Sequence, residues 1–131
     1  LVERSLEVQD FGPSSDDSCD YPDFAQKVAE CIVAGTYDRG IMLCGSGVGA
    51  SVAANKVRGV RASVCHDIYS AHQGVEHDDM NVLCIGARII GKKAAFELVS
   101  AFVDAKFSEG NRHSRRLHKI SLMEERFNDC R

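Results

Sequence analysis

The residues from Gly40 to Val57, GIMLCGSGVGASVAANKV, constrain the fold more than any other part of this chain. Ile41–Cys44 are apolar or small and predict a buried strand, and Ala50–Val57 predict a helix of small residues. Between them lie Gly45, Ser46, Gly47 and Gly49. A glycine-rich turn leaves its backbone amides uncovered, and amides at the start of a helix bind anions. The stretch therefore predicts a strand, an anion-binding loop and a helix.

Cys44 ends the predicted strand, directly before the glycine turn. A thiol beside unpaired amides and a helix start is stabilised as its thiolate, which is the reactive form. The alternative is a structural core cysteine, because Cys65 and Cys84 also end apolar runs. The glycines after Cys44 favour the reactive interpretation. The loop is not a P-loop, since no Gly-Lys-Ser or Gly-Lys-Thr follows, and it is not a clean dinucleotide fingerprint.

Further apolar runs alternate between strand and helix patterns along the chain. The predicted strands are 6–11, 41–44, 60–65 and 81–85, and the predicted helices are 21–34, 50–57, 68–75, 92–107 and 117–127. This alternation predicts an α/β fold with a parallel sheet covered on both faces. Ligands bind beyond the carboxyl ends of such strands, so Cys44, His66-Asp67 and Arg88 are expected at one edge. The first strand is polar, which leaves the sheet one central strand short.

Composition narrows the class of protein. With 131 residues and 44% hydrophobic content, we expect a single domain, 1–131, with residues 108–131 as a C-terminal tail or helix. The net charge of −3 disfavours nucleic acid as a partner. No apolar run reaches the roughly 18 residues of a membrane span, and no signal peptide is visible, so we expect a cytoplasmic protein with no membrane partner. The six cysteines contain no Cys-x-x-Cys pair and are expected as reduced thiols, mostly in the core.

Several polar groups have a plain and a functional interpretation. Asp67 suits a helix N-cap, or a site together with His66. His77 lies among three acidic residues and is either a solvated histidine or a proton donor. The arginines of the string NRHSRRLHK form either a solvated basic face or a clamp for a phosphate monoester. A metal site is disfavoured, because no His-x-x-x-His or Cys-x-x-Cys spacing is present.

Together these groups suit proton transfer next to the carbonyl of a phosphorylated sugar. Removing the proton from carbon 2 of an aldose develops negative charge on the carbonyl oxygen, which preorganised amides stabilise. Cys44 is then the base, His77 opens the sugar ring, and the arginines hold the phosphate.

Four strings along the chain resemble the ribose-5-phosphate isomerase B family, which includes galactose-6-phosphate isomerase subunits. They are DYPDFAQKVAE, IMLCGSGVGASVAANKVRGVRASVCHDIYSA, EHDDMNVLCIGARIIG and RHSRR. The resemblance implies a Rossmann-like three-layer sandwich with a five-stranded parallel sheet. It also implies an isomerase without metal or cofactor that interconverts ribose 5-phosphate and ribulose 5-phosphate. The family's active site is shared between two subunits, which implies a homodimer and leaves a tetramer open.

The resemblance also implies roles for particular residues. Cys44 matches the family's base, Ser46 the hydroxyl beside it, and His77 the ring-opening histidine. The residues that match the substrate-binding positions are Asp20, Tyr21, Gly45, Gly47, Gly49, Asp78, Arg88, Arg112 and Arg116. Where some members have a glutamate base after the glycines, this chain has Ala50, which favours Cys44 as the base.

The sequence departs from the family pattern in two places. Asp78 follows His77 where the family usually has asparagine. The family's first strand, its Asp-His pair and its first helix have no counterpart, and that strand is expected between 6–11 and 41–44. Two alternatives therefore stay open, namely an isomerase of a hexose 6-phosphate such as allose or galactose 6-phosphate, and a sugar-phosphate-binding module without catalysis.

Overall fold

The structure is a computed structural model and describes residues 1–128. In chain order its elements are η1 (Val2–Arg4), α1 (Tyr21–Val33), β1 (Gly40–Cys44), α2 (Val48–Ala54), β2 (Ala62–Val64), α3 (Ile68–Asp78), β3 (Val82–Gly86), α4 (Lys92–Asp104) and α5 (Asn111–Asn128). Strands and helices alternate from β1 to α4, as the sequence predicts.

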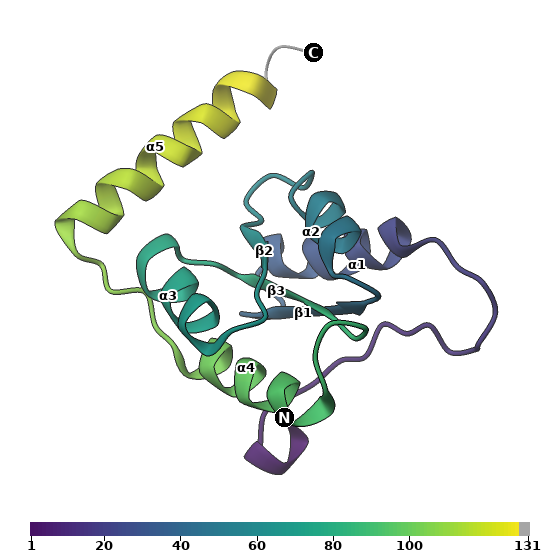
Figure 1. Cartoon of the computed structure of the whole chain (residues 1–131). Coiled ribbons are helices and arrows are strands. Elements are labelled where there is room, and N and C mark those ends of the chain that lie inside the picture. The colour runs from purple at the N-terminus through teal and green to yellow at the C-terminus, as the bar shows by residue number, and fades with distance from the viewer. Residues whose placement is uncertain (129–131) are drawn as a thin grey trace.

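The three strands form a parallel sheet in the order β1-β3-β2. Gly40 to Cys44 pair with Val82 to Gly86, and Ala62 to Val64 pair with Val82 to Cys84. Helices α1 and α2 cover one face of the sheet, and α3 and α4 cover the other (Figure 1). The predicted α/β class with a parallel sheet in three layers is confirmed.

Strand β3 is central and buried over all five residues. Its side chains alternate between the faces, so Leu83 and Ile85 join one core cluster while Val82 and Cys84 join the other. Phe102 and Leu98 of α4 fill the first cluster. The second is built largely from small side chains of α1 and α2, namely Ala25, Ala29, Ala50 and Ala54. These alanines let both helices approach the sheet closely.

The start and end of α1 follow the sequence signals. Pro22 lies in the first turn, where its missing N–H breaks no helical bond. Gly35 follows the last turn with a φ of 73°, the left-handed region that glycine adopts readily. The amide of Thr36 donates to the carbonyl of Cys31 at 3.0 Å, which closes the helix end.

The predicted edge strand at 6–11 is wrong. These residues form no strand, and Leu6 and Val8 are 42% and 46% exposed. A strand needs a neighbour to accept its hydrogen bonds, and no described strand pairs with this segment. The described sheet has three strands, and β1 and β2 are its edges.

Several helix boundaries differ from the predictions. Helix α2 spans Val48–Ala54 rather than 50–57, and α4 ends at Asp104 rather than at 107. Two further differences, at α3 and α5, concern candidate site residues. Helix α3 does not end at Val75 but continues to Asp78, and Asp79, at a φ of 49°, closes it. Helix α5 begins at Asn111 rather than near Leu117, so the basic string lies on a helix. Apolar periodicity fails at both places, because these turns are held by polar contacts between α3 and α5.

Helix α5 crosses the amino edge of the sheet, where the strands begin. Its first half contacts α3, and further along Glu124 accepts a hydrogen bond from the amide of Gly59 at 2.9 Å. Arg58 pairs with Glu125 at 3.5 Å beside it. Several apolar side chains of α5 stay exposed, namely Ile120, Leu122, Met123 and Phe127.

Candidate active site

The glycine loop follows β1 at the carboxyl edge of the sheet and packs against the end of β3. Gly47 has a φ of 83°, and a methyl group added there would fall 3.2 Å from the Ile85 carbonyl carbon. Gly86 faces the loop from the other side, with the backbone of Ser46 2.8 Å from its would-be methyl. Both positions need glycine because two backbones meet there.

Cys44 differs from the other cysteines that end strands. Its Sγ accepts a hydrogen bond from the Gly47 amide at 3.0 Å, inside the glycine loop. Burial instead raises the pKa of Cys65, and it raises the pKa of Cys84 to about 12, with the nearby Cys44 and Cys65 adding to the effect. Cys65 and Cys84 are therefore structural core residues, and Cys44 is the reactive candidate.

The other cysteines divide between core and surface. Cys31 is half-buried and Cys19 is exposed, and all five described cysteines are free thiols. Cys130 lies outside the described residues. The prediction of reduced thiols agrees with the five described cysteines. The prediction that most of them lie in the core is right only for Cys65 and Cys84, which are buried.

Arg88 and Tyr21 lie beside the loop. The Arg88 amide donates to the Gly45 carbonyl at 3.1 Å, and a methyl group on Gly45 would fall 3.7 Å from Arg88 Nε. The ring of Tyr21 occupies the space a side chain on Gly49 would need, 2.6 Å from its would-be Cβ. We call Cys44, the 45–49 loop, Tyr21 and Arg88 the carboxyl-edge group.

Asp20 and Ser46 lie at the borders of this group. Asp20 is the N-cap residue of α1, but its side chain makes no cap hydrogen bond. The hydroxyl of Ser46 accepts a hydrogen bond from the Val48 amide at 3.3 Å. Both side chains are on the surface and available to a ligand at this edge.

His66 and Asp67 have structural roles at the same edge. Asp67 Oδ1 accepts the Ser70 amide at 2.7 Å as the N-cap of α3, and that bond lowers the pKa of the carboxyl. Nε2 of His66 accepts the Gly86 amide at 2.8 Å and so holds the end of β3. The capping interpretation of Asp67 is confirmed.

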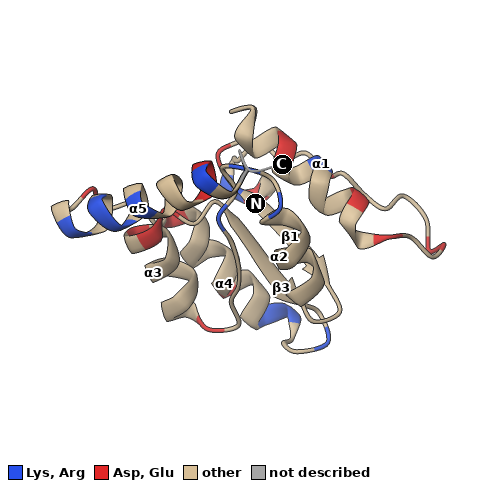
Figure 2. Ribbon diagram, turned by 90° about the horizontal axis from the view of Figure 1, so that it is seen from above, with Lys and Arg blue, Asp and Glu red and all other residues tan. Residues whose placement is uncertain are grey.

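His77 lies in a second group at the amino edge of the sheet. Its ring stacks on His113 of α5, with centroids 4.0 Å apart and planes inclined by 25°. The pKa of His113 is lowered mainly by burial, and also by the nearby His77, Arg112 and Arg116. Asp78 has the opposite effect and raises it. We call His77, Asp78, Arg112, His113 and Arg116 the amino-edge group. Figure 2 shows several Lys and Arg positions, coloured blue, along the ribbon of α5.

The two groups lie at opposite ends of the sheet. Helix α3 runs from the carboxyl end of β2 back to the start of β3, so His77 falls beside the amino ends of the strands. A strand as long as β1 spans about 16 Å, which is too far for one substrate contact. The fold thus places Arg88 beside Cys44, and it places Arg112 and Arg116 of α5 beside the stacked histidines. It does not bring Cys44 and His77 together within one chain.

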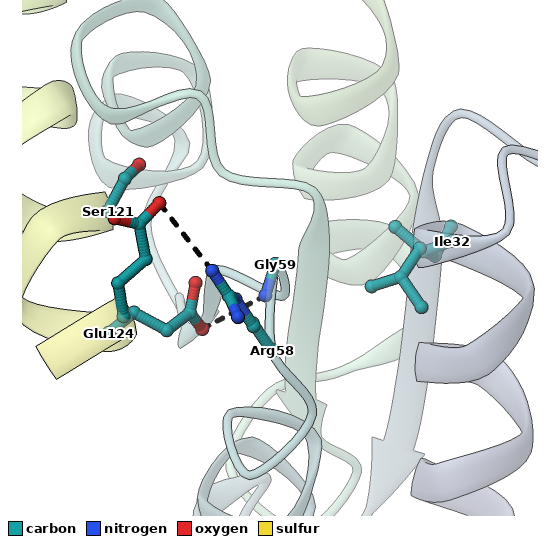
Figure 3. Close-up of a pocket in the computed structure, with 7 residues that line it drawn as sticks. Ile32, Arg58, Gly59, Ser121 and Glu124 are labelled. Atoms are coloured by element: carbon teal, nitrogen blue, oxygen red, sulfur yellow. Dashed lines mark hydrogen bonds and ion pairs between the residues drawn. The ribbon is translucent and has the colours of Figure 1, made fainter. Parts of the chain in front are cut away.

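The cavity in Figure 3 belongs to neither group. It has a volume of about 570 Å³ and lies between the end of α1, the 58–59 turn and the second half of α5. The ion pair of Arg58 with Glu125 and the hydrogen bond from the Gly59 amide to Glu124 anchor α5 to the turn. Among the described residues that line the cavity there is no cysteine and no histidine.

No three His, Cys, Asp or Glu side chains within 1–128 gather in a way that suits a metal ion. None of the helices there has the length and apolar character that crossing a membrane requires.

The sequence did not predict roles for His113, a member of the amino-edge group, or for Gln73 and Ser108, which contact that group. Gln73 contacts His77 across one helical turn, a spacing that is visible only when α3 is extended to Asp78. His113 sits inside the string RHSRR, where the arginines alone drew the interpretation. No local sequence pattern predicts that His113 stacks on His77.

The fold and both groups define an α/β protein with a glycine loop at the carboxyl edge of its sheet, a thiol held by a backbone amide of that loop, and a cluster of arginines and histidines at the amino edge. Residues 1–120 match the ribose/galactose isomerase family. Ribose-5-phosphate isomerase B of Escherichia coli is 45% identical over 128 residues, 98% of this chain and 85% of that protein. D-erythrulose-4-phosphate isomerase of Pectobacterium atrosepticum is 40% identical, over 95% of this chain and 82% of the relative.

A solved structure agrees with these relatives. Ribose-5-phosphate isomerase B of Clostridium thermocellum superposes with a TM-score of 0.93 at 45% identity, over 96% of this chain and 84% of that one. The chain belongs to the ribose/galactose isomerase family. It is a sugar-phosphate isomerase that resembles the B-type ribose-5-phosphate isomerases.

Proposed function

We propose that this protein interconverts ribose 5-phosphate and ribulose 5-phosphate, with Cys44 as the base. The proposal rests on one observation above all, the Cys44 sulfur held 3.0 Å from the Gly47 amide inside the glycine loop. The relatives at 45% identity that are named as ribose-5-phosphate isomerases support the choice of substrate.

The reaction follows from the position of the thiolate. Cys44 removes the proton from carbon 2 of the open-chain aldose, and the electron pair of that bond forms a carbon–carbon double bond while the carbonyl oxygen becomes anionic. The amides of Gly45, Gly47 and Gly49 stabilise that oxygen. The hydroxyl on carbon 2 then gives its proton to the anionic oxygen on carbon 1. Cys44 returns its proton to carbon 1, so that carbon 2 becomes the ketone and carbon 1 a hydroxymethyl group.

The other site residues bind and prepare the substrate. His77 opens the furanose ring, and the guanidinium groups of Arg88, Arg112 and Arg116 hold the phosphate. Asp20, Tyr21 and Ser46 line the sugar beside the loop, and Asp78 accepts a hydrogen bond from a sugar hydroxyl next to His77. Amides and guanidinium groups stabilise the negative charge, so this route uses no metal ion or cofactor.

We further propose that the working form is a homodimer in which the carboxyl-edge group of one copy meets the amino-edge group of the other. The separation of Cys44 and His77 supports this arrangement, since neither group alone holds all of the required chemistry. Apolar side chains exposed at the carboxyl edge support it too, namely Val48, Val52, Ile68, Tyr69, Ile89 and Phe96. Residues 1–131 then act as one isomerase domain, with α5 as its C-terminal helix. Its free thiols fit a cytoplasmic location.

Turnover tests the proposal directly. The protein is incubated with ribose 5-phosphate, and ribulose 5-phosphate is measured as it forms. In heavy water the product should contain deuterium at carbon 1, because the proton passes through Cys44 and exchanges with solvent. A product with no deuterium would contradict proton transfer by a side chain.

Substrate comparison separates the candidate functions. The values of kcat/KM are measured for ribose 5-phosphate, for allose and galactose 6-phosphates, and for a tetrose 4-phosphate, which the name of the Pectobacterium relative suggests. We expect the pentose to be preferred. A clear preference for a hexose or tetrose phosphate would replace the substrate, and binding without turnover of any of them would leave a binding module.

A further inference from the structure

The stacked pair of His77 and His113 has different neighbours at each ring nitrogen. Each imidazole has two nitrogens, and in the neutral ring one donates a hydrogen bond while the other accepts. The partner at each nitrogen therefore decides where the proton sits. Three polar neighbours define these partners, namely Gln73 on α3, Arg112 on α5 and Ser108 in the segment before α5.

His113 is held as a neutral ring with its proton on Nδ1. Arg112 approaches Nε2 with its Nη2 at 3.2 Å and its Nε at 3.4 Å. A guanidinium only donates, so Nε2 must accept and Nδ1 must hold the proton. Nδ1 then donates to Ser108 Oγ at 2.6 Å. The side chain is 9% exposed, and burial together with the nearby cations lowers its pKa.

His77 has the opposite arrangement. Its Nδ1 lies 2.9 Å from Nε2 of Gln73, one turn earlier on α3. An amide nitrogen only donates, so Nδ1 accepts and the proton of the neutral ring lies on Nε2. No described residue is hydrogen-bonded to His77 Nε2, which leaves that N–H for a substrate.

We propose that Gln73 and His113 are positioning residues for His77. Gln73 fixes the tautomer with the proton on Nε2, and the stacked ring of His113 fixes the plane of the imidazole, so that Nε2 can donate its proton to the ring oxygen of the sugar. The inference rests on the proposed function of His77 in ring opening. As the bond from carbon 1 to the ring oxygen breaks, that oxygen takes the Nε2 proton. The hydroxyl on carbon 1 loses its proton to water and becomes the aldehyde, and His77 regains a proton from water.

The neutral state of His113 also supports proton transfer by His77. Two stacked imidazolium rings would repel each other, so a neutral His113 lets His77 take up and give its proton without a charged ring beneath it. The charged groups facing the pair are Arg112 and Arg116 from α5 and Asp78 from α3. Glu76, also on α3, is paired with His72 at 3.0 Å.

Backbone contacts hold the segment that contains Ser108 against α3. The Ser108 amide donates to the Glu76 carbonyl at 3.0 Å and ties the segment before α5 to α3. Arg39 donates to the carbonyls of Met80 and Ala105 at 2.9 and 3.0 Å, which joins the ends of α3 and α4. Ser108 therefore cannot move away from His113 without breaking contacts at the end of α3.

His72 provides a control on the same helix. Its Nδ1 faces the carboxylate of Glu76, which only accepts, so His72 must hold a proton on Nδ1. Two histidines on α3 thus have the same spacing to a partner one turn away but opposite protonation at Nδ1. A method that reads tautomers can test both in a single spectrum.

Long-range proton–nitrogen NMR correlation spectra of the full chain, labelled with ¹⁵N-histidine at pH 8, test the proposal. The signals are assigned with His72→Asn, His77→Asn and His113→Asn. We expect the proton on Nε2 of His77 and on Nδ1 of both His72 and His113. A proton on Nδ1 of His77, or on Nε2 of His113, would overturn the inference.

A second variant extends the test to the reaction. In Gln73→Glu the carboxylate accepts, so the proton of His77 should move to Nδ1, and kcat for ribose 5-phosphate should fall by at least about 100-fold with little change in KM. The matched control is Gln26→Glu on α1, whose partner is Glu30 rather than a histidine; kcat should stay within about twofold. Unchanged kcat in Gln73→Glu would overturn the positioning role.

The two readouts separate this inference from the proposed function. If the native protein isomerises ribose 5-phosphate while the tautomers differ from those expected, the positioning role is wrong and the function stands. If the tautomers are as expected but the native protein turns over no ribose 5-phosphate, ring opening by His77 is wrong, and its fixed tautomer then has no role in that reaction.

Discussion

The carboxyl-edge and amino-edge groups are built in different ways. At the carboxyl edge, Cys44 and its amide donor Gly47 lie within one loop, and the backbones of Ile85 and Gly86 press against that loop. At the amino edge, His77 meets its partner His113 only because α5 packs on α3. The first group depends on local backbone geometry and the second on long-range packing. Substitutions should therefore affect them differently.

The largest expected effect comes from the thiol. Cys44→Ala should lower kcat/KM at least about 1,000-fold for every sugar phosphate that the protein accepts, because the base is lost. Steady-state kinetics with ribose 5-phosphate measure it, and Cys31→Ala, a half-buried cysteine on α1, is the control. Full turnover by Cys44→Ala would mean that another group is the base.

His77→Asn should give a smaller and selective loss. We expect kcat for ribose 5-phosphate to fall about 100-fold, since general acid catalysis of ring opening is lost. A tetrose 4-phosphate cannot close a ring, because its terminal oxygen is esterified, so its turnover should fall much less. Equal losses on both substrates would show that His77 acts in the proton transfer itself.

Glycine substitutions test the rigidity of the carboxyl edge. Gly47→Ala combines a φ of 83° with backbone atoms 3.2 Å from the new methyl, and should cost about 2 kcal/mol or more in free energy of unfolding. Gly35→Ala has a φ of 73° but open space and should cost about 1 kcal/mol. Gly91→Ala has neither and should stay within about 0.5 kcal/mol. Urea unfolding gives all three, and equal costs would contradict the tight loop packing.

The smallest expected effect is that of His113→Asn at the amino edge, which should change how the free energy of unfolding depends on pH. The pKa of His113 is lowered in the folded state, so the unfolded chain binds its proton first. The stabilisation is complete above the unfolded pKa of about 6.5 and is lost as the pH falls through the lower folded value. Urea unfolding between pH 8 and 5 should therefore show a shallower decline for His113→Asn than for the native chain. Parallel curves would contradict the lowered pKa.

The contrast between the groups also explains what the sequence could predict. The glycine loop and its flanking strand and helix follow from local patterns, because each depends on neighbours along the chain. The placement of Arg88 beside Cys44 follows from the parallel sheet, because the carboxyl ends of its strands meet at one edge. The edge strand at 6–11 was wrong, since alternation of side chains does not supply a hydrogen-bonding partner. The end of α3 was placed too early, because polar residues hide a last turn that His113 and Ser108 stabilise from outside.

Mixing two inactive variants tests most directly the central claim, that Cys44 of one copy works with His77 of another. Cys44→Ala and His77→Asn are mixed in equal amounts, unfolded and refolded together, and assayed with ribose 5-phosphate. In a randomly paired homodimer about half of the dimers are mixed and each has one intact site, so about a quarter of the native activity should return. Activity no higher than the average of the two separate variants would contradict the shared site and place both residues in the site of a single chain.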